Sequence, residues 1–398
     1  MKKVIIAIIG IYACISLTAQ QVVCGSIIKS NEENKRRARF DSTIAYHFYR
    51  GDYKLDSTSI TIPIVVHIVW QNDNENLTDA LIMSQIDALN RDYNALNSDI
   101  QYVPDEFKPV IGNVGIHFCL AAKDPQGNPT TGIVRQQTSQ PDMGLSSDLF
   151  YTSLGGSDAW DVNRYMNIWV ANTGQYIAGY GIYPWSDSAG RSGLVVNSPF
   201  FGINGGPQYG LGRVCVHEVG HYLGLIHLWG DVYDCSVSDR VSDTPPQSGP
   251  YYGCPSYPEY GCGGSTMFMN FMDYVDDQCM LLFTEGQKAR MVVCLNTYRA
   301  GLINSNAQCL VPSQSNDLNA KIYPNPGTGI FTVAFATPPM NLLTYSVYNE
   351  MGELILTNAE LANKDISFDM TGYSAGVYMF IVKENGITVF KTKVLKEQ

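Results

Sequence analysis

Three of the six histidines in the chain fall within eleven residues, and their spacing constrains the fold and the chemistry more than any other feature. The segment His217–His227 reads HEVGHYLGLIH, which is the pattern HExxHxxGxxH. Residues four positions apart share one face of a helix, so His217 and His221 can bind the same ion. Gly224 can adopt the left-handed conformation that ends a helix, and the chain can then turn and bring back His227 as a third ligand.

Three neutral imidazoles leave the fourth position on a zinc ion open to water, which is the arrangement of catalytic rather than structural zinc sites. Zinc lowers the pKa of that water toward about 7. Glu218 follows the first histidine and can accept the proton of the water as it attacks a carbonyl group. We therefore predict a hydrolytic zinc site with His217, His221 and His227 as ligands and Glu218 as the general base. The alternative is an amphipathic helix with histidines on its surface.

A second element, NFMDY at residues 270–274, lies downstream of the zinc motif. Met272, placed under the three imidazoles, would form a hydrophobic floor, and Tyr274 could swing toward the metal. A methionine by itself is usually a core residue. Its position after the long zinc motif favours the interpretation that it belongs to the site.

The N-terminus has the pattern of a secretory signal peptide. A short basic start is followed by an apolar run from Val4 to Leu17, which is shorter than the roughly 20 residues that a spanning helix needs. We predict a signal peptide at 1–19 with cleavage after Ala19. A lipoprotein signal at Cys14 and a buried helix are the alternatives. No later stretch is long and apolar enough to be a transmembrane segment.

Charge excludes one class of partner. The chain has 26 basic and 37 acidic residues, a net charge of −11, and no long basic run outside Lys35–Arg39. Binding to phosphate needs clustered Lys and Arg, so nucleic acid is not expected as the main partner. A chain of 398 residues can bury a sizeable core, so a monomer is expected.

The chain divides into segments of different composition. Residues 20–54 are polar and contain the basic cluster, which indicates a pro-segment cleaved near Arg36–Arg39 or at Arg50, or a solvated linker. After a linker at 313–319, residues 320–398 lack Cys, His and Trp and alternate like short strands, which predicts a small all-β sandwich. Between them, 55–312 is the predicted catalytic domain.

Periodicity gives a coarse secondary structure for the catalytic domain. Strands are predicted at 62–70, 115–120, 166–170 and 193–197, and helices at 77–96, 211–223 and 283–295. The segment 230–270 is rich in Gly, Pro, Asp, Ser and Cys and has little periodicity. Such a loop region needs disulfides or metal ions to hold it.

Export also explains the cysteines. Ten are present, nine of them after the signal peptide, and an oxidising compartment favours disulfides. The odd mature count leaves one thiol over. Cys24, followed by Gly25, is a natural candidate, and a thiolate is a strong zinc ligand that could occupy the open position and keep the enzyme latent. The alternatives are a disulfide to another cysteine, or loss with a longer signal peptide.

These motifs resemble a known family. The zinc motif and the Met-turn are similar to those of the metzincins. More narrowly, HEVGHYLGLIHLWG, DRVSDTPPQ at 239–247 and NFMDYVDDQCMLLFTEGQKARM at 270–291 resemble the pappalysins, especially the bacterial members, over roughly residues 60–310. The resemblance implies an α+β fold: a metzincin catalytic domain with a mixed twisted sheet, a long helix and an active-site helix, above an irregular, disulfide-rich lower half. The substrate would lie between the two halves.

The resemblance also implies roles for individual residues. Tyr274 would help to stabilise the tetrahedral intermediate. The family pattern implies the disulfides Cys235–Cys262 and Cys254–Cys279. The pairing of Cys119, Cys215, Cys294 and Cys309 stays open, with Cys294–Cys309 as a guess from closeness in sequence.

Two further features carry weaker hypotheses. The loop from Asp239 to Thr244 offers carboxylates and carbonyls, hard oxygen ligands that suit calcium, and the pappalysins bind calcium in this region. The candidate ligands are Asp239, Val241, Asp243 and Thr244, and a solvated acidic turn is the alternative. Some pappalysins cleave before basic residues through an acid in the pocket; Asp276 and Asp277 are candidates, although either could be a surface residue.

The C-terminal segment has a resemblance of its own. IYPNP at 322–326, VYNEMG at 347–352 and SAGVY at 374–378 look like the sorting domain of type IX secretion cargo in Bacteroidetes. This implies the type IX machinery as a partner and a secreted or cell-surface location, reached through the periplasm and the outer membrane. A carbohydrate-binding or adhesion sandwich is the alternative.

Together these features predict a secreted zinc endopeptidase that acts on proteins or peptides and is made as a latent pro-form. One alternative is a surface-displayed binding or adhesion protein with a vestigial zinc site, although an intact Glu218 argues against it. The other is a zinc exopeptidase, which would need a charged anchor for a chain terminus.

Overall fold

The computed structural model describes most of the chain. The described residues are 23–26, 30–51, 60–186, 190–303, 305, 307, 309, 320–335, 342–349, 354–361, 365–384 and 387–398. The expected signal peptide at 1–19 and linker at 313–319 lie outside these ranges.

A seven-stranded sheet has the order β1-β6-β7-β5-β2-β3, with β4 paired with β2. Six of its strands form the upper half of the catalytic domain, and β1 comes from the segment that precedes it. The pairs are parallel except for β6 with β7. β2 lies at the centre, and both of its faces are buried because its sequence is a nearly continuous apolar run. The strands are β1 (Val23–Cys24), β2 (Ile60–Trp70), β3 (Ile116–Leu120), β4 (Ile133–Gln137), β5 (Met166–Ala171), β6 (Ile177–Gly181) and β7 (Gly193–Asn197).

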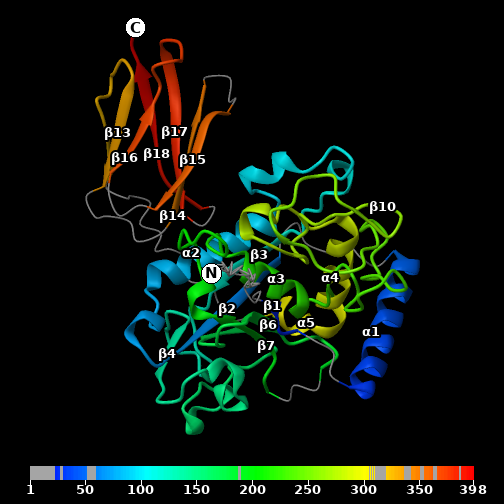
Figure 1. Ribbon diagram of the computed structural model, residues 1–398. Helices are drawn as coiled ribbons and strands as arrows, with labels where there is room; N and C mark the ends of the chain where they lie inside the picture. The colour runs from blue at the N-terminus through cyan, green and yellow to red at the C-terminus, as the bar shows by residue number, and fades with distance from the viewer. Residues whose placement is uncertain are drawn as a thin grey trace, which may run out of the picture.

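The catalytic domain has three longer helices (Figure 1). They are α2 (Asp79–Asp92), α3 (Arg213–Tyr222) and α4 (Glu285–Tyr298), and α4 is followed by the short α5 (Ala300–Ile303). α2 and α3 pack against the sheet, while α4 lies beside α1 (Asn31–Arg50). α2 begins where the Thr78 side chain accepts a hydrogen bond from Leu81 N, and it buries Ile82, Ile86 and Leu89 at helical spacing. Short 3₁₀ turns span Asp73–Glu75, Ser98–Tyr102, Lys108–Val110, Met143–Leu145, Ser147–Phe150, Thr152–Leu154, Ser198–Phe200 and Asp277–Cys279.

The lower half, from residue 230 to 283, is irregular as predicted. Its only strands among the described residues are two-residue pairs: β8 (Tyr252–Gly253), β9 (Tyr260–Gly261), β10 (Gly264–Ser265) and β11 (Tyr274–Val275). Disulfides Cys235–Cys262 and Cys254–Cys279 cross-link this half. They constrain a segment that has little regular hydrogen bonding of its own.

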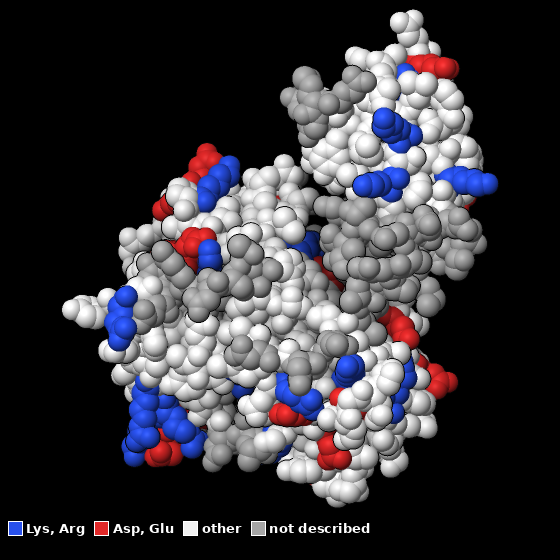
Figure 2. Space-filling view, turned by 180° about the vertical axis from the view of Figure 1, so that it is seen from behind, with Lys and Arg blue, Asp and Glu red and all other residues white. Residues whose placement is uncertain are grey.

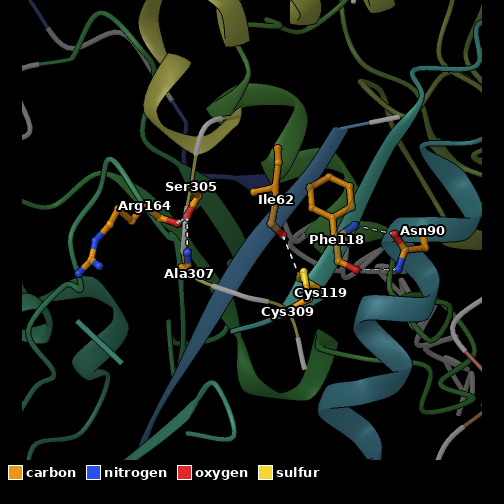
Figure 3. The surroundings of a disulfide bond; sticks show 8 residues. All are labelled: Ile62, Asn90, Phe118, Cys119, Arg164, Ser305, Ala307 and Cys309. Carbon is orange, nitrogen blue, oxygen red and sulfur yellow. Dashed lines mark hydrogen bonds between the residues drawn. A yellow bond between two sulfur atoms is a disulfide. The ribbon is translucent and has the colours of Figure 1, made fainter. Parts of the chain in front are cut away.

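A third disulfide joins β3 to the end of the catalytic domain (Figure 3). It links Cys119 to Cys309 over 190 positions, so the guess that Cys309 pairs with Cys294 is wrong. Cys294 is instead a free, buried thiol on α4. Asn90 on α2 holds β3 beside that helix: it accepts a hydrogen bond from Phe118 N and donates one to Phe118 O. The chain after α5 runs past β3, which brings Cys309 to Cys119 although the two are far apart in sequence.

The segment before the catalytic domain is not a linker. It forms α1 (Asn31–Arg50), capped by Ser30 and ended by Gly51 at φ +74°. The basic cluster of residues 35–39 lies within this helix, and Figure 2 shows a group of Lys and Arg side chains at the edge of the molecule where α1 lies. On the inner face, Phe40 and Ile44 are buried against the catalytic domain.

The C-terminal segment forms a separate body of two antiparallel sheets (Figure 1). The sheets have the orders β12-β13-β16 and β15-β14-β17-β18 and share one apolar core, so the predicted all-β sandwich is confirmed. Sequence periodicity did not predict β12 and β15. The strands are β12 (Ala320–Tyr323), β13 (Ile330–Phe335), β14 (Leu342–Tyr348), β15 (Leu354–Leu361), β16 (Ile366–Asp369), β17 (Gly376–Glu384) and β18 (Ile387–Lys396).

None of the helices in the described ranges has the length and apolarity needed to cross a membrane.

Candidate metal centre and cleft

The three histidines of the zinc motif converge on one point. α3 places His217 and His221 on the same face, with their Nε2 atoms 3.0 Å apart. The chain turns at Gly224, which has a φ of +90°, and brings His227 Nε2 to 3.1 Å from His221 Nε2 and 3.3 Å from His217 Nε2. All three side chains are buried.

This arrangement fits a zinc ion. The three Nδ1 atoms face acceptors: Phe271 O at 2.7 Å, Leu225 O at 2.9 Å and Asp231 Oδ1 at 2.5 Å. Each ring therefore carries its proton on Nδ1, and three Nε2 lone pairs point at one another. Such lone pairs repel unless a cation lies between them. Ligands about 2.0–2.1 Å from a tetrahedral zinc are separated by roughly 3.3 Å, close to the observed spacing.

Met272 packs against α3, the helix that carries His217 and His221. It is fully buried, and a Cβ atom at Gly220 would lie 2.6 Å from its sulfur, so the close packing of the Met-turn against α3 depends on that glycine. Tyr274 lies beside the imidazoles, with its ring centroid 4.9 Å from that of His227. Its hydroxyl does not bond a histidine; it donates to the carbonyl oxygen of Cys24 at 3.4 Å.

Glu218 is buried next to the three histidines. Its Oε2 accepts hydrogen bonds from Ser26 Oγ at 3.3 Å and Cys24 Sγ at 3.4 Å. Burial raises the pKa of this carboxyl to about 8, because removing it from water disfavours the charged form. A carboxyl with a pKa near neutrality is suited to accept and release a proton.

The residues that cover Glu218 come from the N-terminal segment. β1 pairs with β6 as an added edge strand: Val23 N donates to Tyr176 O at 2.9 Å, and Gly25 N donates to Gly179 O at 2.8 Å. This pairing places the thiol of Cys24 among the histidines, where its sulfur and the ligand atoms of all three imidazoles lie within 4.8 Å of one another. The Cys24 thiol thus lies where a fourth ligand would bind.

A pocket opens beside this centre, lined by apolar side chains that include Val23, Ala178, Val214 and Met280, together with Tyr209. Asp276 and Asp277 do not line it directly, but both lie near Tyr209. Burial, together with the negative charges of these two carboxylates, raises the pKa of the Tyr209 hydroxyl to about 12.

The two candidate specificity residues have different surroundings. Asp277 is buried; its Oδ2 accepts bonds from Leu211 N and Arg213 N at 2.8 and 3.1 Å, whereas its Oδ1 has no partner in the described part of the chain. Asp276 is less buried and accepts a bond from Gln208 Nε2 at 3.0 Å. Asp277 is therefore the better placed of the two to offer a free carboxylate oxygen.

The structure brings together three of the four candidate calcium ligands. Asp239 is buried, and the Thr244 hydroxyl lies 2.8 Å from its Oδ1 and 3.0 Å from the carbonyl oxygen of Val241. Burial raises the pKa of Asp239 to about 7. The side chain of Asp243 is engaged elsewhere, at the start of α4, where it accepts bonds from Thr284 Oγ at 2.7 Å and Gly286 N at 2.8 Å.

Three residues around the centre were missed by the sequence analysis. Ser26 contacts Glu218, Trp229 stacks on the ring of His227 with centroids 4.6 Å apart, and Asp231 bonds Nδ1 of the same histidine. Asp231 lies four residues after a zinc ligand, a spacing that could have suggested it. Nothing in the local sequence marks Ser26.

Comparisons with known proteins agree with this geometry. The family model described as pregnancy-associated plasma protein-A matches residues 153–296, and the model of a secretion system C-terminal sorting domain matches residues 321–397. An extracellular metalloprotease of Arthroderma otae is 27% identical over 302 residues, which cover 73% of this chain and 97% of the relative. One from Arthroderma gypseum is 28% identical, covering 73% of this chain and 89% of the relative.

Solved structures of metallopeptidases also match the chain. A mutant promirolysin of Tannerella forsythia matches with a TM-score of 0.65 and 37% identity, covering 71% of this chain and 97% of that one. Mature mirolysin of the same organism, in complex with a cleaved peptide, matches with a TM-score of 0.58 and 40% identity, covering 62% and 99%. The likeness therefore extends to both a pro-form and a mature form.

Proposed function

The chain belongs to the pappalysin family of metallopeptidases, and from this premise we propose that it is a zinc endopeptidase made in a latent form, with Glu218 as its general base. The chain is a secreted zinc metallopeptidase that acts on proteins or peptides, and its C-terminal unit is a type IX sorting domain. The observation that carries the proposal is the buried Glu218 carboxyl beside three converging imidazoles.

Each residue of the centre has a proposed role. His217, His221 and His227 hold the metal, and zinc, when bound there, supplies a Lewis acid that acidifies water and polarises a carbonyl group. Glu218 takes the proton of the attacking water and can later pass it to the leaving amine. Tyr274 donates a hydrogen bond from its hydroxyl to the carbonyl oxygen as negative charge develops on that oxygen. An extended substrate would use the edge of β6 that β1 occupies.

Latency follows from the occupants of the cleft. Cys24 is proposed as the zinc ligand of the pro-form. The expectation of a single leftover thiol is wrong, because Cys215 and Cys294 are free as well. In this state Ser26 and Cys24 both contact Glu218, and the Cys24 carbonyl holds the hydroxyl of Tyr274. The base and the proposed oxyanion donor are thus engaged together. Loss of the segment 20–54 would release both.

We further propose that the pocket beside the centre prefers Lys or Arg after the scissile bond. The support is the partnerless Oδ1 of Asp277, a buried acceptor near Tyr209 at the pocket wall. The negative charges of Asp276 and Asp277 beside Tyr209 would favour a basic side chain in the pocket, although neither carboxylate lines it. Asp276 is the second candidate, although Gln208 already occupies one of its oxygens.

Calcium is proposed for the loop that contains Asp239, Val241 and Thr244, with Asp243 as a further candidate. The support is the burial of the Asp239 carboxylate, which costs free energy unless a cation or hydrogen bonds compensate it. The domain boundaries of the sequence analysis are proposed unchanged: pro-segment 20–54, catalytic domain 55–312, linker 313–319 and sorting domain 320–398.

The decisive test is Glu218→Ala in the activated enzyme. We expect peptide hydrolysis to fall by roughly 10²–10⁴-fold while zinc content stays the same, because the ligands are untouched and only the base is removed. Glu285→Ala is the matched control, since Glu285 is exposed and pairs with Lys288 in the first turn of α4. Turnover at the wild-type rate in Glu218→Ala would remove the base from the mechanism.

A further inference from the structure

The three imidazoles of the metal centre are held in different ways. His217 and His221 direct Nδ1 at the backbone carbonyls of Phe271 and Leu225. His227 alone directs its Nδ1 at a side-chain carboxylate, Oδ1 of Asp231, at 2.5 Å. A carboxylate is a stronger acceptor than a carbonyl, and it carries a negative charge that favours a cation on the far side of the ring.

The backbone is shaped to make this contact. Gly230 has a φ of +63° and Asp231 a φ of +66°, so two consecutive residues are left-handed. A residue other than glycine in that region carries a conformational cost, which Asp and Asn tolerate best. The turn directs the Asp231 side chain back to the histidine four residues earlier. Its second oxygen, Oδ2, is buried and has no hydrogen-bond partner among the residues described.

His227 needs such a contact more than the other two ligands do. His217 and His221 extend from α3, so the helix itself sets their directions. His227 follows the left-handed Gly224, outside regular structure, and its ring is held by the stacked Trp229 and by Asp231. Trp229 fixes the plane of the ring but not its rotation within that plane. A hydrogen bond at Nδ1 fixes the rotation and directs Nε2 at the metal.

We propose that Asp231 is a positioning residue of the zinc centre, which orients His227 and raises the affinity of the site for zinc. The inference rests on the proposed role of His227 as a ligand. It also accounts for Oδ2, an oxygen that is buried without a partner among the described residues: the carboxylate is compensated when the imidazole that it touches binds a cation.

The left-handed backbone allows a clean test. Asp231→Gly removes the carboxylate and suits a φ of +66°, so it does not strain the turn. Asp231→Asn keeps the shape and a neutral acceptor. Asp234→Asn is the matched control, because Asp234 is exposed in the same loop and its hydrogen bonds go to Ser236, away from the histidines.

The measurement is the zinc dissociation constant of the full-length chain, determined by competition with a chelator, together with the absorption spectrum of the cobalt-substituted protein. We expect the zinc dissociation constant to rise 10–100-fold in Asp231→Gly. It should rise by a smaller factor in Asp231→Asn and stay unchanged in Asp234→Asn. The melting temperature of the metal-free protein should change little. The cobalt spectrum should change in Asp231→Gly, because one ligand is no longer fixed.

Two results separate the possible failures. If the wild-type chain binds zinc tightly and Asp231→Gly and Asp231→Asn bind it equally tightly with the same cobalt spectrum, Asp231 has no positioning role. If His227→Ala also leaves zinc affinity unchanged, the assignment of His227 as a ligand, and with it the proposed function, is at fault.

Discussion

Ser26 contacts the general base at about the same distance as the cysteine two residues before it. Its hydroxyl accepts a bond from Gly181 N at 2.7 Å and lies 3.3 Å from Glu218 Oε2, while its backbone N donates to the sulfur of Cys24 at 3.2 Å. One short peptide thus engages the base, the edge of β6 and the proposed fourth ligand position. At the scale of single residues, latency depends on two side chains.

Removing each side chain from the pro-form should separate their effects. Cys24→Ala should make the uncleaved pro-form active or able to mature without added protease, because the fourth position on zinc becomes open to water. Ser26→Ala should raise the activity only a few-fold, since the thiol remains. Hydrolysis of a quenched peptide by the purified pro-forms measures both, with Ser42→Ala, an exposed serine on α1, as the control. A silent Cys24→Ala pro-form would leave steric cover as the cause of latency.

His67 is a buried residue with no part in the site, and it gives the fold a pH dependence. It lies in β2 between Ser157 Oγ and Asn167 Oδ1, at 2.8 and 3.0 Å, and burial lowers its pKa to about 4. In the unfolded chain a histidine has a pKa of about 6.5. Between these values the unfolded state binds a proton that the folded state does not, so stability falls as the pH falls.

We expect the free energy of unfolding to decrease by on the order of 3 kcal/mol between pH 6.5 and pH 4 because of His67. Urea denaturation of the protein at several pH values measures this slope. His67→Gln, which cannot titrate, should be less stable near neutrality but should show a shallower decrease toward acid. An equally steep decrease in both proteins would contradict the assignment.

At the scale of elements, α1 determines how the pro-segment is held and where it can be cleaved. Its Phe40 ring packs where a Cβ atom of Gly224 would otherwise lie, and Asp41 pairs with Arg290 at 2.6 Å. The helix therefore anchors the pro-segment at a second place, apart from the pairing of β1 with β6. Its basic cluster at 35–39 lies within the hydrogen-bonded helix. A protease binds its substrate in an extended form, so this part of the helix must open before it can be cleaved.

Limited trypsin digestion of the Glu218→Ala pro-form should therefore cut first after Arg50 or Lys54, not after Arg36, Arg37 or Arg39. The physical reason is that Arg50 ends the helix, and Gly51 follows in the left-handed conformation. Mass spectrometry identifies the first fragments. Size-exclusion chromatography should show that the cleaved pro-segment stays associated with the catalytic body, because β1 and α1 keep their contacts. First cuts within 36–39 would show that α1 opens more readily than its packing suggests.

Local patterns predicted the parts of the molecule that local interactions determine. The zinc helix, the central strand and the disulfide-rich lower half could be inferred because 3.6-residue spacing, apolar runs and the family motifs lie in continuous segments. α1 could not, because Phe40 and Ile44 are buried by Trp185, Ile226 and Val293, which are far away in sequence. Cys119–Cys309 was missed for the same reason, because its two cysteines meet only in the folded chain.

At the scale of the whole molecule, the catalytic body and the C-terminal sandwich have separate apolar cores. We expect a chain that ends at residue 312 to keep full peptidase activity after maturation but to fail to reach the cell surface. A chain that ends at residue 303 lacks Cys309 and should be less stable by roughly 2–5 kcal/mol, because Cys119 loses its partner. Activity assays, cell fractionation and thermal melts of both truncations test this. An inactive but folded chain 1–312 would mean that the boundary is wrong.

The Cys119–Cys309 link has a mechanical consequence. A sorting domain that is held by export machinery or fixed to a cell surface transmits any pull to the end of the catalytic body. Because Cys309 is bonded to β3, that load enters the sheet at β3, next to the central strand β2, and the residues between α5 and Cys309 carry little of it. The helix α4 lies outside this path. A pull on the tail would therefore load β3 before it reached α5 or α4.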